Sequence, residues 1–172
     1  MGFAKHDSSS NLNKGEHMKG DQKVIDHLNL LLSLDLTAID LYFVQSRMYE
    51  DWGLLKLKDH FIHEMEEEQM HASRMIERIL FLEGLPSLTE RAPYQLFSET
   101  PKILQQNLDM EMRVLVELKN GIALCESLQD FQSRDLLQDL LKDTEEDHVF
   151  WLETNLGLIE KVGLDNYLQS MM

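Results

Sequence analysis

The residues best suited to chemistry form two copies of a short motif, Glu68-x-x-His71 and Glu145-x-x-His148. Side chains three residues apart on a helix are neighbours on one face, so each copy would present a carboxylate beside an imidazole. Both copies interrupt an apolar helical stripe, where a charged group is costly unless it is paired or bound to a metal ion. One copy could arise by chance in an acidic helix. Two copies on two separate helices predict a metal site.

Two further carboxylates, Asp35 and Glu111, interrupt the apolar stripes of the other two long helical segments. If the four segments form a bundle, all these groups can converge at one level of its core. The candidate ligands are then six: Asp35, Glu68, His71, Glu111, Glu145 and His148. Carboxylate and imidazole ligands suit a pair of iron or manganese ions, and zinc is also compatible. Four buried carboxylates would repel one another strongly, and two divalent cations would cancel that charge.

Each of these residues has a simpler interpretation when it is taken alone. The acidic run at 64–68 is typical of a solvated helix face, and we expect Glu66 and Glu67 to be solvated. A lone histidine such as His71 is more often a hydrogen-bonded, partly buried side chain than a ligand. Asp35 alone could lie on the surface. For no metal site to exist, all four interruptions of the stripes would have to be accidental.

The composition limits both the fold and the partners. The chain has 172 residues, which suits one domain with one core, and 43% of them are hydrophobic. Only 3 prolines and 8 glycines favour long helices over sheet. A formal net charge of −15 argues against nucleic-acid binding and favours cations. The single cysteine excludes an intrachain disulfide framework and indicates a reducing, cytoplasmic setting. We find no signal peptide and no apolar run of about 18 residues, so no membrane association is predicted.

Hydrophobic periodicity and helix start and stop signals predict an all-α fold, a four-helix bundle with a short fifth helix. The predicted helices lie at about 22–51, 54–83, 100–125, 130–160 and 164–172. Residues 84–99 show no period and hold two of the three prolines. A connection of this length between the second and third helices predicts a crossover along the whole bundle.

Residues 1–17 are polar and aperiodic. We predict a disordered extension there, either native or derived from an expression vector. The bundle domain would then occupy residues 18–172, with Met18 as a plausible original start.

Segments beyond the candidate ligands resemble the bacterioferritins, from Met18 nearly to the end of the chain. They read MKGDQKVIDHLN, SRMYEDWGL, ERILFLEGLP and GLDNYLQ. The resemblance implies a ferritin-like subunit in a hollow homo-oligomeric shell of twenty-four subunits. It implies iron storage and detoxification, in which a ferroxidase centre oxidises Fe²⁺ with O₂ or peroxide and ferric mineral is stored inside. A ferredoxin-type reductant would release the iron.

The resemblance also assigns roles to the ligands by position. Glu68 and Glu145 would bridge two irons. The other four would complete the two iron sites in pairs: Asp35 with His71, and Glu111 with His148.

Five further residues receive roles only from the resemblance. Tyr42 corresponds to the tyrosine beside the centre that donates an electron. His63 and Glu67 fall where some members hold an iron on the inner surface. Asn166 and Gln169 would line the four-fold channel.

Two departures from the family pattern bear on function. The family usually has glutamate where this chain has Asp35, and the shorter side chain would hold its iron less firmly. In bacterioferritins a methionine directly after the bridging glutamate of the second helix ligates a haem shared by two subunits. Here that residue is Gln69, and Met70 is turned by about 100° from it. We therefore predict no haem in a shell of this subunit alone.

These departures leave an alternative function open. The chain would then be mainly a structural shell subunit with a weakened ferroxidase centre, co-assembled with a haem-binding subunit. A rubrerythrin-like or Dps-like protein fits less well. The first would have a CxxC tail, and the second is usually smaller, with a centre between subunits.

Overall fold

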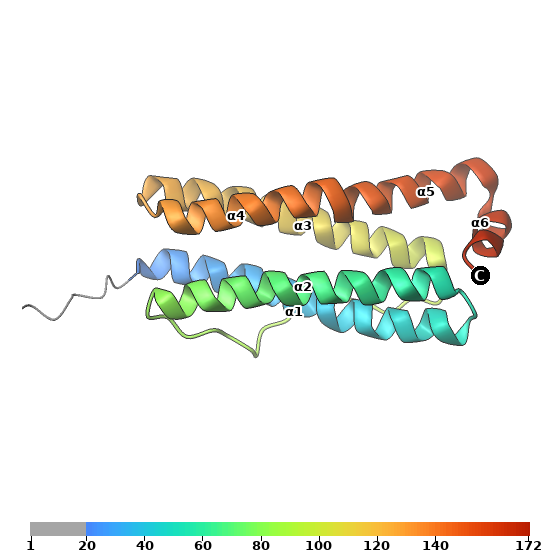
Figure 1. Cartoon of the computed structure of the whole chain (residues 1–172), viewed down its shortest axis with the longest axis horizontal. Coiled ribbons are helices and arrows are strands. Elements are labelled where there is room, and N and C mark those ends of the chain that lie inside the picture. Colours follow the sequence, from blue (N-terminus) through green and yellow to red (C-terminus); the bar gives the residue numbers. More distant parts are fainter. Residues whose placement is uncertain (1–19) are drawn as a thin grey trace, which may run out of the picture.

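The computed structural model describes residues 20–172, so the predicted extension at 1–17 lies outside the described residues. The helices in chain order are α1 (Gln22–Asp51), α2 (Leu55–Phe81), α3 (Thr100–Ser127), α4 (Phe131–Asp143), the π-helical turn η1 (Thr144–Val149), α5 (Phe150–Val162) and α6 (Leu164–Ser170). Figure 1 shows two layers, with α1 and α2 in one and α3 beside the α4–η1–α5 rod in the other. The prediction of an all-α four-helix bundle with a short fifth helix is confirmed.

The predicted fourth helix differs in one respect. It is interrupted at Thr144–Val149, where the backbone turns as a π-helix between α4 and α5. The three pieces still form one continuous rod (Figure 1). Single π-turns of this kind often lie at functional sites, and this one contains His148.

The antiparallel pair of α1 and α2 begins at a capped end and closes at a tight turn. The Asp21 carboxylate accepts a hydrogen bond from the Lys23 backbone N–H at 2.8 Å, which is a typical N-cap. Gly53, at φ +73°, allows the short turn between the two helices. Several leucines of α1, including Leu28 and Leu32, are fully buried in the core. Burial of each such side chain contributes roughly 1.5–3 kcal/mol.

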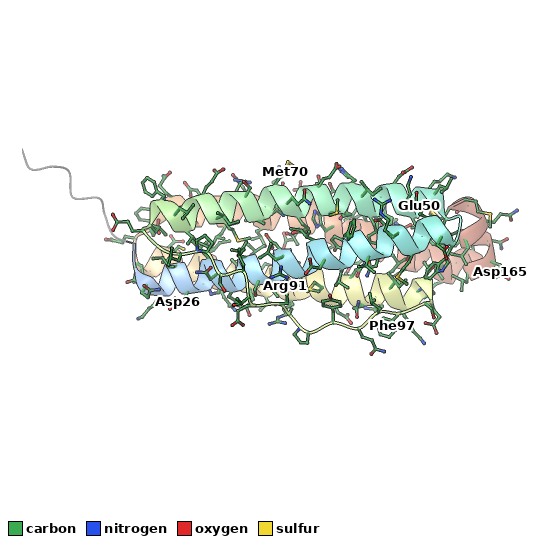
Figure 2. All side chains as sticks on the ribbon, turned by 90° about the horizontal axis from the view of Figure 1, so that it is seen from below. Asp26, Glu50, Met70, Arg91, Phe97 and Asp165 are labelled. Carbon is green, nitrogen blue, oxygen red and sulfur yellow. The ribbon has the colours of Figure 1, made fainter. Side chains whose placement is uncertain are left out.

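The segment between α2 and α3 runs the length of the bundle beside α1, as predicted (Figures 1 and 2). Four hydrogen bonds fix it to α1, one of them from the Asn29 side-chain amide to the Leu85 carbonyl at 3.2 Å. The Ser87 N–H donates to Asn29 Oδ1 (2.7 Å), the Ala92 N–H to Thr37 Oγ1 (2.8 Å), and Arg91 Nε to Asp40 Oδ2 (2.8 Å). This crossover makes α2 and α3 run in the same direction, which places Glu68 and Glu111 at one level.

Helix α6 folds back over the end of the bundle where α1 turns into α2 (Figure 1). The buried Tyr167 hydroxyl donates to Asn155 Oδ1 at 2.9 Å, and the Lys56 N–H donates to the Met171 carbonyl at 3.0 Å. Tertiary contacts therefore hold a helix too short to be stable alone.

Among residues 20–172, one helix, α1, is long enough and on average apolar enough for a membrane span, although Asp35 and Asp40 interrupt its apolar residues. Of its most apolar window, 56% is buried inside the bundle. That burial is typical of a core helix.

Candidate metal centre

Five of the six predicted ligands meet in the bundle core: Asp35, Glu68, His71, Glu111 and His148. All five are buried. They form two adjoining groups, Asp35 with Glu68 and His71, and Glu68 with Glu111 and His148. Within each group the ligand atoms lie within 4.8 Å of one another. Because Glu68 belongs to both groups, the arrangement offers two neighbouring cation sites with one shared carboxylate.

Hydrogen bonds between α1 and α3 position this centre. The Tyr42 hydroxyl donates to Glu111 Oε1 at 2.5 Å. One turn away, the amides of Gln45 and Asn107 exchange two buried hydrogen bonds, at 3.0 and 2.7 Å. The two helices therefore cannot slide past each other without breaking buried hydrogen bonds, which fixes the height of Glu111 in the core.

His148 has acidic neighbours on both sides of its ring. Its Nδ1 lies 3.0 Å from Glu68 Oε1 and 3.8 Å from Glu111 Oε2, whereas its Nε2 lies 3.4 Å from Glu67 Oε2. Burial alone would lower the pKa of His148, but the acidic side chains around it outweigh burial and raise that pKa well above its usual range.

The buried carboxylates are surrounded by too few positive charges to stabilise the ionised form of all of them. Burial, together with the charges of Glu68 and Glu111, raises the pKa of Asp35 well above its usual range. Burial would raise the pKa of Glu68 as well, but the contacts with His148 and His71 outweigh it and hold that pKa at about 2. One carboxyl group is thus driven toward its neutral form beside another that is driven toward its charged form. Divalent cations would remove that conflict.

Several buried polar atoms of the centre have no hydrogen-bond partner: Asp35 Oδ2, Glu111 Oε2, His148 Nδ1 and, next to the centre, Glu64 Oε1. Buried polar atoms are normally satisfied, and exceptions need an explanation. Coordination of a cation would supply one here. The donor set of carboxylate oxygens and imidazole nitrogens suits iron, so these residues fit a di-iron centre.

The structure does not place Glu145 with the other five. Its side chain is exposed on η1, and its Oε1 forms an ion pair with Lys119 Nζ at 2.9 Å. The predicted position assumed a continuous α-helix, in which Glu145 and His148 share a face. A π-turn has more residues per turn, so three residues cover less rotation and the two side chains diverge. The predicted position of Glu145 is therefore corrected, and its bridging role stays a prediction.

Two acidic residues of α2 approach the centre more closely than their sequence context suggested. Glu64 is buried one turn before Glu68, and burial raises its pKa to about 8. Glu67 was expected to be solvated, but it is only partly exposed, and its Oε2 is buried beside His148. Together with His148 they form a third group of ligand atoms within 4.8 Å. The sequence signal for Glu64 was its spacing of four residues from Glu68, which places both on the same apolar helix face. No sequence signal identified Glu67 as a neighbour of this centre.

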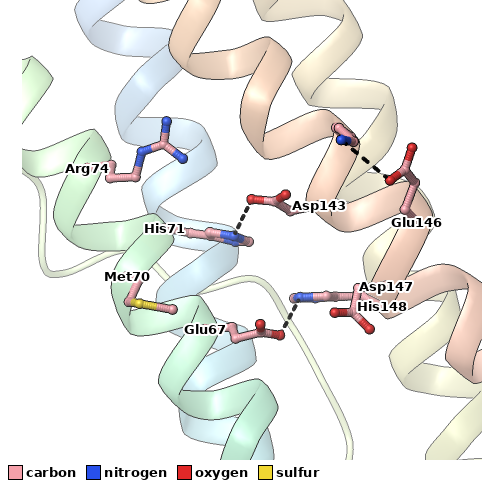
Figure 3. Close-up of a pocket in the computed structure, with 9 residues that line it drawn as sticks. Glu67, Met70, His71, Arg74, Asp143, Glu146, Asp147 and His148 are labelled. Atoms are coloured by element: carbon pink, nitrogen blue, oxygen red, sulfur yellow. Dashed lines mark ion pairs between the residues drawn. The ribbon is translucent and has the colours of Figure 1, made fainter.

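A cavity of about 570 Å³ leads from solvent to the centre between α2 and the α4–η1 segment. Glu67, His71 and His148 line it, together with Asp143, whose Oδ2 lies 3.7 Å from His71 Nε2 (Figure 3). The cavity therefore gives small ions and oxidants direct access to two of the candidate ligands. His63 lies on the same helix with its Nε2 3.5 Å from Glu67 Oε1. An iron there stays a prediction.

Comparisons with known proteins agree with this geometry. A family model described as Ferritin-like domain matches residues 25–162. The chain is 54% identical over 155 residues to a protein named Bacterial ferritin from Synechocystis, covering 90% of this chain and 99% of the relative. It is 51% identical over 157 residues to Bacterial ferritin of Pseudomonas aeruginosa, with 90% and 100% covered. It is 37% identical over 152 residues to Bacterioferritin of Brucella melitensis, with 88% and 94% covered. The chain belongs to the ferritin family, among the bacterial ferritins and bacterioferritins.

Proposed function

We propose that this protein stores and detoxifies iron, oxidising Fe²⁺ with O₂ or peroxide at a di-iron ferroxidase centre and depositing ferric mineral inside a multi-subunit shell. The observation that carries the proposal is the shared carboxylate. Glu68 belongs to two ligand groups, one completed by Asp35 and His71 and the other by Glu111 and His148. Two Fe²⁺ ions held side by side could each give one electron to the same oxidant.

The protein side chains would hold the ions, limit water around them and keep a proton close by. Burial of Glu111 and His148 removes competing water, which strengthens their attraction for cations. Burial and the charge of Glu111 raise the pKa of Tyr42, so its hydroxyl keeps its proton in the bond to Glu111. An electron leaving Tyr42 could therefore be accompanied by transfer of that proton to Glu111. This supports Tyr42 as the electron donor.

Glu145 can bridge the ions only if its ion pair with Lys119 breaks. Exposed ion pairs contribute only about 0–1 kcal/mol, so the change is inexpensive. We expect Lys119→Met to raise the affinity of the centre for Co²⁺ by up to about five-fold. Anaerobic titration of the Co²⁺ absorption bands measures this. Lys142→Met is the matched control, because it removes the same charge from a pair with Glu146 at 3.8 Å. Equal affinities in the two variants would argue against Glu145 as a ligand.

A shell made only of this subunit should not bind haem in the manner of the family. Gln69 is exposed on α2 where the haem methionine would stand, and an amide is a poor substitute for a thioether. Met70 instead lines the cavity beside the centre. We expect no strong Soret band after reconstitution with haem, and a band in Gln69→Met as the positive control. Bis-thioether haem spectra from the unmodified protein would contradict this.

The alternative, a mainly structural subunit with a weak centre, is motivated by the shorter side chain of Asp35. In the structure Asp35 nevertheless lies with Glu68 and His71 inside one ligand group. Its position supports a working centre. A rapid, stoichiometric phase of Fe²⁺ oxidation in the pure homopolymer would rule the alternative out.

Members of the ferritin family form multi-subunit shells and bind iron. We propose that this shell contains this subunit alone or mixed with a haem-binding subunit, and that it lies in the cytoplasm. Iron release would use a ferredoxin-type reductant. Asn166 and Gln169 are exposed on α6, at one end of the bundle, which is compatible with a role as channel residues.

A further inference from the structure

Met70 stands at the mouth of the cavity that leads to the centre. It is 58% exposed, and it lines the cavity with Glu67, His71 and His148 (Figure 3). It directly precedes the candidate ligand His71 in the sequence and follows Glu68 by two residues. A molecule that moves between solvent and the centre through this cavity passes the Met70 thioether.

The chemistry of Met70 differs from that of its surroundings. Every other residue lining this cavity is acidic, basic or a histidine. Methionines usually fill gaps in apolar cores, as Met75 does here at 1% exposure. Met70 contributes little packing of that kind. What it adds to the mouth is a soft sulfur atom that accepts oxygen.

We propose that Met70 is the site where peroxide is intercepted at the mouth of the ferroxidase centre, through conversion of its side chain to the sulfoxide. The inference rests on the proposed function, because peroxide passes here either as the oxidant or as the product of O₂ reduction. In the step, the O–O bond of H₂O₂ breaks and one oxygen atom forms an S=O bond with Met70 Sδ. The sulfur is oxidised by two electrons, and the other oxygen leaves as water. Methionine sulfoxide reductases reverse this modification.

The chain contains its own controls for this proposal. Met112 is 46% exposed on α3, and Met172 is 67% exposed at the C-terminus. Neither lines the cavity. Met65 is partly buried and shares with Met70 the tryptic peptide 59–74. Fragment ions therefore separate Met70 from a less accessible methionine within one peptide.

The test compares two oxidations of the assembled protein by mass spectrometry. In one, metal-free protein is treated with added H₂O₂, which measures the intrinsic accessibility of each methionine. In the other, the protein oxidises successive additions of Fe²⁺ in air. For each methionine, sulfoxide formed during iron oxidation is divided by sulfoxide formed by added peroxide. We expect this ratio to be higher at Met70 than at Met112 and Met172. Equal ratios at the three positions would overturn the proposal.

Two variants connect the modification to the centre. In Glu68→Ala the sulfoxide ratio at Met70 should fall to that at Met112 and Met172. A ratio that stays higher at Met70 in this variant would overturn the proposal. In Met70→Leu the excess oxidation of peptide 59–74 during iron oxidation should vanish, whereas an excess that remains in this peptide would place the site elsewhere. Iron oxidation is recorded in the same samples. Rapid iron oxidation without excess at Met70 removes this inference and leaves the proposed function standing, whereas absence of rapid iron oxidation removes both.

Discussion

Replacing Glu68 with alanine should abolish the rapid phase of Fe²⁺ oxidation. Glu68 is the carboxylate common to both ligand groups, so its loss disrupts two cation sites at once. Removal of partners outside the ligand shell already costs 10–100-fold in metal affinity or activity, so we expect loss of the shared ligand to slow oxidation by at least about 100-fold. Stopped-flow absorbance of the ferric product measures the rate. His148→Ala should lose the same phase.

The control for Glu68→Ala is Glu66→Ala, which removes the same side chain from an exposed position on the same helix. It should oxidise iron at the rate of the unmodified protein. Without metal, Glu68→Ala should be less stable than the unmodified protein near neutral pH, because the contacts with His148 and His71 that hold the pKa of Glu68 at about 2 also stabilise the folded protein. Unchanged oxidation kinetics in both Glu68→Ala and His148→Ala would contradict the proposed centre.

Metal binding should produce the second large effect, a rise in thermal stability. A ligand that binds only the folded protein stabilises it by about 2.7 kcal/mol at a concentration 100 times its dissociation constant. At about 2–4 °C per kcal/mol for a domain of this size, each occupied site should raise the unfolding temperature by roughly 5–10 °C. Differential scanning calorimetry of metal-free protein, with and without redox-inactive Zn²⁺, measures the shift.

The same experiment on variants shows where the ions bind. Glu68→Ala should lose most of the Zn²⁺-dependent shift, whereas Glu66→Ala should retain it. An equal shift in the two variants would mean that Zn²⁺ stabilises the protein through other acidic groups. The net charge of −15 makes that comparison necessary.

Much of the fold could be predicted from the sequence because its local signals agree with one another. Asp21 before the first apolar stripe, Gly53 between α1 and α2, and Thr100–Pro101 at the start of α3 all lie where the helices begin or end. The long aperiodic segment after α2 required a crossover. The pattern of buried carboxylates at Asp35, Glu68 and Glu111 was predictable for the same reason, since a charged residue on an apolar stripe is conspicuous.

What could not be predicted depends on the backbone of the fourth helix and on side-chain reach. The π-turn Thr144–Val149 has no sequence signature comparable to a glycine or a proline, yet it alone changes the direction of Glu145. The prediction that Glu67 is solvated was wrong. The helical period of hydrophobic residues assigns it to the solvated face, whereas a flexible glutamate side chain can bend inward to a partner such as His148. The different directions of the Gln69 and Met70 side chains were predictable, because they follow from the rotation of about 100° per residue in a regular helix.

The most direct test of the di-iron ferroxidase is an anaerobic titration of a pure homopolymer with Fe²⁺, followed by rapid mixing with O₂ or peroxide. The amplitude of the fast phase is then plotted against the iron added per subunit. If Glu68 holds two ions side by side, the amplitude should rise linearly and saturate at two Fe²⁺ per subunit, and Glu68→Ala should show no such phase. A fast phase that never saturates, or one that survives in Glu68→Ala, would contradict a ferroxidase centre at this site.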